Sequence, residues 1–162
     1  MKQAVTYGRK GLGTVIVAML GENTRNFSTY PGLFEDVIAV GAIEKNSRGQ
    51  LERHLYSPSH LNLSVVAPGS NIYTTYSGNG YISNFGGPTA ATAFVSGVAA
   101  LVISNTPTAT VNVVRDKREK SAQKIRTDIY NYGTHPSKPN GTWSGDLGYG
   151  MVDAERAASA YG

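Results

Sequence analysis

Three runs of consecutive apolar residues constrain the fold of this chain more than any other feature. They read VIVAML at residues 15–20, DVIAVGAI at 36–43 and LSVVAPG at 63–69. Continuous runs rich in β-branched residues are typical of parallel strands that are buried on both faces. We therefore expect the run at 15–20 to be a central strand of such a sheet. It is far too short to span a bilayer.

Segments with helical features alternate with these runs. The expected helices are the end of a helix at 2–9, a helix of small apolar residues at 88–104, an amphipathic surface helix at 109–130 and a short final helix at 152–160. The helix at 88–104 should be buried on nearly every side, whereas 44–60 and 131–148 have the composition of surface loops. Strands alternating with helices predict an α/β fold, with a mainly parallel sheet and helices on both faces.

Composition excludes several classes of function. The chain has 162 residues, enough for one domain, and no cysteine, which rules out disulfides and thiolate metal sites. Its net charge of +4 is mild, and the densest charge run, at 115–120, mixes acids with bases and lacks aromatics. We interpret that run as a solvated helix face and expect no nucleic-acid partner. His54, His60 and His135 have no ligand-type neighbours at metal spacing, so we expect surface histidines and no identifiable cofactor.

Thr89 is the candidate catalytic residue, because its hydroxyl lies at the start of the apolar helix, directly after the sequence Gly-Gly-Pro. A helix N-terminus offers unpaired N–H groups and partial positive charge, which stabilise an oxyanion. Gly86 and Gly87 would let a substrate backbone approach closely. The simpler interpretation is that Thr89 caps the helix and the glycines only form a turn, and this segment alone favours it.

Five blocks of the sequence resemble the subtilases, the subtilisin- and kexin-like serine proteases, in the order of that family. The segment GGPTAATAFVSGVAAL resembles the nucleophile pattern G-T-S-x-A-x-P-x-V-x-G, which Gly87, Ala91, Val95 and Gly97 match. The other blocks are TVIVAMLGEN, YPGLFEDVIAVGAI, VVAPGSNIYTT and GYGMVDAERAASA. The resemblance implies that residues 1–162 are the C-terminal part of a subtilase catalytic domain, a subtilisin-like fold whose N-terminal half is missing.

The resemblance also implies roles for individual residues. Thr89 occupies the nucleophile position, and Asn23 with the Thr89 N–H would hold the oxyanion. The pocket for the residue before the cleaved bond would be lined by Met19, Leu20, Gly21, Tyr30 and Gly32, and the Tyr30–Pro31 bond is expected to be cis. Calcium binding and secretion are implied only by the family, since the start of the chain lacks the apolar core of a signal peptide.

The chain departs from the family pattern at the site itself. Threonine replaces the nucleophilic serine, Pro88 replaces the preceding threonine, and Ala93 replaces a later proline. The sequence Gly21-Glu22-Asn23 is one residue longer than the usual Gly-Asn, so Asn23 serves only if the loop absorbs the insertion. The triad aspartate and histidine would lie before Met1. Because subtilisin loses about 10⁶-fold in kcat without its histidine, we expect the chain alone to be inactive.

The sequence is consistent with three interpretations of function. The first is a fragment of a subtilisin-like endopeptidase, which acts on peptide or protein substrates when joined by a separate N-terminal half. The alternative is a degenerate, non-catalytic subtilase that binds peptides or partners. The third is an unrelated α/β structural domain. No membrane partner is expected. The run at 15–20 is typical of a strand that other segments cover on both faces. Without that cover, the isolated chain should self-associate or be poorly soluble.

Overall fold

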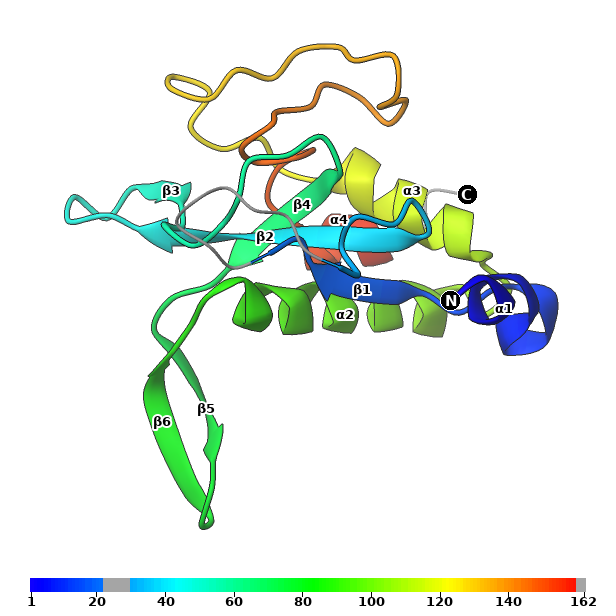
Figure 1. The fold of residues 1–162 in the computed structure, drawn as a ribbon, viewed down its shortest axis with the longest axis horizontal. Coiled ribbons are helices and arrows are strands. Elements are labelled where there is room, and N and C mark those ends of the chain that lie inside the picture. Colours follow the sequence, from blue (N-terminus) through cyan, green and yellow to red (C-terminus); the bar gives the residue numbers. More distant parts are fainter. Residues whose placement is uncertain (22–29, 160–162) are drawn as a thin grey trace.

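The computed structural model describes residues 1–21 and 30–159, and its helices and strands alternate along much of the chain (Figure 1). The strands are β1 (Ile16–Met19), β2 (Val37–Lys45), β3 (Leu51–Arg53), β4 (Leu63–Pro68), β5 (Ile72–Tyr76) and β6 (Gly80–Phe85). The helices are α1 (Lys2–Tyr7), a 3₁₀ turn η1 (Gly8–Gly11), α2 (Pro88–Asn105), α3 (Val111–Ser121) and α4 (Ala154–Ala158).

β2 is the centre of the main sheet. It pairs in parallel with β1, where Ile16 is opposite Val37, and in parallel with β4, where Val40 is opposite Val65. The short strand β3 is antiparallel to the end of β2. The expected α/β fold with a mainly parallel sheet is therefore confirmed.

The two faces of this sheet are covered differently. On one face, Val40 and Val65 pack with Val95 of α2. On the other face, Leu63 packs with Ile125 and Leu147, which belong to the irregular segment between α3 and α4. A third cluster joins α2 to α3 and α4. The helical cover of the sheet in the described residues is thus mainly on the α2 face.

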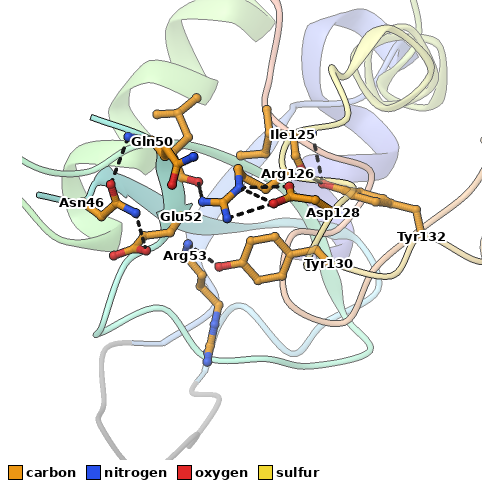
Figure 2. Close-up of polar contacts among 10 residues, drawn as sticks. Asn46, Gln50, Glu52, Arg53, Ile125, Arg126, Asp128, Tyr130 and Tyr132 are labelled. Atoms are coloured by element: carbon orange, nitrogen blue, oxygen red, sulfur yellow. Dashed lines mark hydrogen bonds and ion pairs between the residues drawn. The ribbon is translucent and has the colours of Figure 1, made fainter. Parts of the chain in front are cut away.

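The expected helix at 109–130 is wrong in its second half, because α3 ends at Ser121. Backbone bonds between Gln123 and Met151 (N to O, 2.8 and 2.9 Å) take the chain into an extended bridge instead. Polar contacts then fix the following loop against β3: Tyr130 Oη accepts a hydrogen bond from Arg53 N at 2.9 Å, and Arg126 Nη1 donates to Leu51 O at 3.4 Å (Figure 2). Within the loop, Arg126 pairs with Asp128 at 3.0 Å. Helical periodicity persisted in the sequence because Ile125 is still needed in the core.

Two strand pairs lie where loops, or no element, were expected. Residues 44–60 contain the end of β2 and all of β3, joined by a turn in which the Asn46 side chain accepts from Arg48 N and Gln50 N. β5 and β6 form a hairpin that projects from the body of the molecule (Figure 1). The turn residues between alternating segments were the sequence signal for these pairs.

β1 and α2 are less covered than their sequences suggest. Among the described residues β1 pairs only with β2, so its second edge is open, and each of its residues is only half-buried. α2 buries one stripe, which includes Ala91, Val95 and Val102, but exposes Phe94 and Leu101 on its other side. The expectation that α2 is buried on nearly every side is wrong for this chain. α2 is also long and apolar enough to cross a membrane, a property that core helices share.

Candidate functional site

Thr89 lies in the first turn of α2, but it does not cap that helix. The N-cap residue is Gly87, which has φ 88°, and no side chain bonds to the free N–H groups of the first turn. Pro88 takes the first helical position, where its missing N–H costs nothing. The Thr89 side chain is exposed. Capping therefore does not account for its hydroxyl.

The glycines before α2 serve the packing of the chain on itself. A Cβ on Gly86 would lie 2.8 Å from Gly69 O, and one on Gly69 would lie 2.6 Å from the Ala42 Cβ. Gly87 N donates to Gly69 O at 2.7 Å. The position that a side chain at Gly86 would occupy is thus filled by the turn after β4. This contact fixes the start of α2 beside the carboxyl end of β4.

The end of β1 lies against Thr89. Thr89 Oγ1 donates to Met19 Sδ at 3.7 Å, which joins the start of α2 to the last residue of β1. Sequence reasoning placed Met19 in the substrate pocket but did not anticipate this contact. No spacing rule could have found it, because the two residues are 70 positions apart.

The other pocket residues gather at the same end of β1. Gly32 packs so closely that a Cβ there would lie 2.6 Å from Met19 O and 2.8 Å from Leu20 Cα. Gly21 is buried, and Leu20 is fully buried in the core, so Leu20 could offer a substrate only its backbone. Tyr30 is 71% exposed. The Tyr30–Pro31 bond is cis, as expected. Asn23 and Glu22 lie outside the described residues.

The three histidines are engaged in local turns. In each, the ring Nδ1 accepts a hydrogen bond from the backbone N–H of the residue two positions later in the sequence. The N–N distances are 3.1 Å for His54, 3.0 Å for His60 and 3.2 Å for His135. His54 is buried, so our expectation of a surface histidine is wrong there; it packs on Tyr56 and approaches Glu44. In the part of the chain that the structure describes, none of them bonds to Thr89, and no group of three or more possible metal ligands occurs.

A buried polar cluster lies away from Thr89, in the charge run that we interpreted as a solvated helix face. Arg118 is fully buried and Glu119 nearly so. Ser64 Oγ donates to Glu119 Oε1 at 2.6 Å and accepts from Arg118 Nη2 at 3.5 Å, while Asn140 donates to Glu119 Oε2 at 2.7 Å. The spacing of Val114 and Arg118 on α3 was the sequence signal for this burial.

Arg118 is poorly compensated in this cluster. Its Nε and Nη1 have no hydrogen-bond partner in the part of the chain that the structure describes. Burial lowers the pKa of Arg118 from its ordinary value to about 10, although nearby Glu119 opposes this shift. The group has no contact with Thr89, and its position between α3 and β4 indicates a structural role.

A known protein family and several known proteins match this sequence. The Subtilase family matches residues 1–150. Subtilisin DY from Bacillus licheniformis is 35% identical over 137 residues, which is 82% of this chain and 47% of that protein. Subtilisin from Bacillus pumilus is 38% identical over 125 residues, which is 75% of this chain and 43% of that protein. The chain thus spans less than half the length of these curated relatives.

Solved structures share the fold. Fervidolysin from Fervidobacterium pennivorans, described as a keratinolytic enzyme related to subtilisin, matches 99% of this chain and 24% of its own, with a TM-score of 0.78 and 24% identity. MycP1 with its N-terminal propeptide removed matches 98% of this chain and 55% of its own, with a TM-score of 0.74 and 19% identity. Because the family match covers nearly the whole sequence and the fold agrees, this chain belongs to the subtilase family.

Proposed function

We propose that this chain is the nucleophile-bearing part of a subtilisin-like endopeptidase domain. The observation that carries the proposal is the Thr89 hydroxyl, which is exposed in the first turn of an 18-residue helix and is not used as a cap. The sequence similarity to subtilisins supports the assignment of reaction class.

In the complete domain, Thr89 Oγ1 would attack the carbonyl carbon of a peptide bond while a histidine outside this chain accepts its proton. The Thr89 N–H, and Asn23 if its loop allows, would stabilise the oxyanion. The amine would leave with the proton from the histidine, and water would then hydrolyse the ester. Met19, Gly21, Tyr30 and Gly32, with the backbone of Leu20, would border the pocket for the preceding residue. The γ-methyl of Thr89 restricts χ1, so the reaction should be slower than with serine.

The chain alone should not hydrolyse peptides, because none of the described histidines reaches Thr89. The test incubates casein and chromogenic peptides with the purified chain, and then with the chain plus an N-terminal subtilase half that carries the aspartate and histidine. We expect turnover only in the mixture, lost in Thr89→Ala and raised in Thr89→Ser. Thr92→Ala is the matched control, because the Thr92 hydroxyl bonds only within the helix, to Pro88 O at 2.8 Å.

Two outcomes would contradict this proposal. Turnover by the chain alone that disappears in Thr89→Ala would show that a base is already present. A folded mixture that stays inactive even with Thr89→Ser would remove the peptidase assignment.

A second candidate function is peptide or partner binding without catalysis, and it is favoured by the edge of β1 that has no strand partner in residues 1–21 and 30–159. Residues 16–19 carry no charge and no proline, the features that usually protect an edge strand. A groove of about 480 Å³ runs beside this edge, lined by Ile16 and Val17 of β1 and by Ala99 and Ile103 of α2. An extended strand from the N-terminal half would fit such an edge by β-addition. Binding of that half should survive Thr89→Ala and weaken in Val17→Lys, as measured by calorimetry.

A further inference from the structure

The sulfur of Met19 is the polar partner of the Thr89 side chain in the described structure. The Oγ1–Sδ distance of 3.7 Å is within range for a hydroxyl donating to a thioether. The chain has three methionines, and the other two lie elsewhere: Met1 at the N-terminus, and Met151 in a backbone bridge to Gln123. Of the three methionines, only Met19 contacts the hydroxyl at the nucleophile position, and its side chain is half-buried.

We propose that Met19 is a site of methionine oxidation, and that its oxidation state sets the conformation of the Thr89 hydroxyl. Oxidation by a peroxide uses a sulfur lone pair: sulfur bonds to one peroxide oxygen, the O–O bond breaks, and the other oxygen leaves as water. Sulfur is oxidised by two electrons to the sulfoxide, and the peroxide is reduced. A hydroxyl that donates to the same sulfur competes for that lone pair, so Thr89 should slow the oxidation of Met19.

The sulfoxide should in turn act on Thr89. The sulfoxide oxygen is a stronger hydrogen-bond acceptor than the thioether sulfur, and it projects beyond that sulfur. The Thr89 hydroxyl should therefore turn towards the sulfoxide oxygen. The hydroxyl can turn by rotation about the Cβ–Oγ1 bond or by a change between the few staggered χ1 states of threonine. Met19 acts here as a positioning residue for Thr89. This inference requires no hydrolysis, so it stands or falls separately from the proposed peptidase function.

The first test measures oxidation of the full chain by dilute hydrogen peroxide, with each methionine followed by peptide mass spectrometry. In Thr89→Val, which removes the hydroxyl but keeps the shape, Met19 should oxidise about threefold faster than in the wild type. Thr89→Ser keeps the hydroxyl and should behave as the wild type. Met1 and Met151 report whether the variants alter reactivity generally, and their rates should not change.

The second test follows the Thr89 γ-methyl signal by ¹³C NMR before and after oxidation. The signal should shift in the wild type and stay in place in Met19→Leu, which cannot form a sulfoxide. Equal Met19 oxidation rates in the wild type and Thr89→Val would overturn the proposal. An unchanged chemical shift of the Thr89 γ-methyl after oxidation of Met19 would also overturn the proposal.

Discussion

β1 and β2 are neighbouring parallel strands with the same kind of sequence, but they differ in cover. Residues 37–43 of β2 are all buried, whereas every residue of β1 is only half-buried. β2 has partners on both edges, and β1 has one among the described residues. A continuous apolar run therefore indicates how much cover a strand needs, and the surrounding structure decides how much it receives.

The same contrast divides α2. Its stripe with Val95 and Val102 packs on the sheet and on α3, while Phe94 and Leu101 are exposed on the opposite side. Residues 54–114, which include α2 and the hairpin, contain no Asp, Glu, Lys or Arg. The exposed side consequently lacks the charges that keep protein surfaces apart.

The largest effect should come from a charge on the buried side of α2. Val95→Asp leaves an unpaired carboxylate in the core and should reduce the free energy of unfolding by about 3 kcal/mol or more, or prevent folding. Leu101→Asp is the matched change on the exposed side and should alter it by less than about 0.5 kcal/mol. Urea melts followed by circular dichroism compare the two. Similar losses in both variants would mean that the exposed side is covered in solution.

The buried polar cluster between α3 and β4 contains a group that weakens the fold. Arg118→Met combined with Glu119→Gln should raise the free energy of unfolding by about 1–4 kcal/mol, because a buried charge with unpaired N–H groups is replaced by apolar contacts and no buried carboxylate is left uncompensated. Arg115→Met is the control, since Arg115 is half-buried and donates to Glu35 O at 2.7 Å. A loss of stability in this double variant would show that the cluster with Ser64 depends on the guanidinium.

The pH dependence of that gain follows from the lowered pKa. Above about pH 10 Arg118 binds its proton less well in the folded chain, where its pKa is lowered, than in the unfolded chain. The unfolded state therefore holds more protons, and the stability of the wild type rises with pH relative to the double variant Arg118→Met with Glu119→Gln. The advantage of the variant should be complete below pH 10 and shrink above it. A constant difference in alkaline urea melts would contradict the burial of a charged Arg118.

The exposed side should make the isolated chain self-associate. Replacing Phe94 and Leu101 together by lysine should weaken that association by roughly tenfold, about 1.4 kcal/mol, because lysines repel across an apolar contact. Size-exclusion chromatography with light scattering, over a range of concentrations, measures the change. The double substitution Val113→Lys with Ile129→Lys, at exposed positions elsewhere, is the control. A monomeric wild type with a sharp unfolding transition would show that this side needs no cover.

The smallest effects distinguish two threonines at helix starts. Thr110 caps α3, where its side chain accepts from Val113 N at 3.3 Å, so Thr110→Ala should cost about 1 kcal/mol. Thr89 caps nothing, and Thr89→Ala should change the free energy of unfolding by less than about 0.5 kcal/mol. Thermal melts at matched concentration compare the two. A larger loss in Thr89→Ala would assign the hydroxyl a structural role.

Sequence reasoning found most of the elements and missed particular ones for physical reasons. The strands at 15–20, 36–43 and 63–69 and the helix from Pro88 were predictable because continuous apolar runs and glycine turns are local signals. The helix expected to 130 stopped at Ser121 because a backbone bridge to Met151 competed with it. The hairpin of β5 and β6 was missed although its turn residues were visible.

The sequence by itself determined the family, the α/β class and the place of Thr89 at the start of α2, because those depend on residues adjacent in the chain. The tertiary structure alone decided that Gly69 and Gly86 meet, that Met19 accepts from Thr89, that Arg118 is buried, and that β1 pairs on one edge only among the described residues. Each of these joins segments that lie far apart in sequence, or depends on what covers a surface. Burial and contact belong to the assembled fold, and no local pattern of residues fixes them.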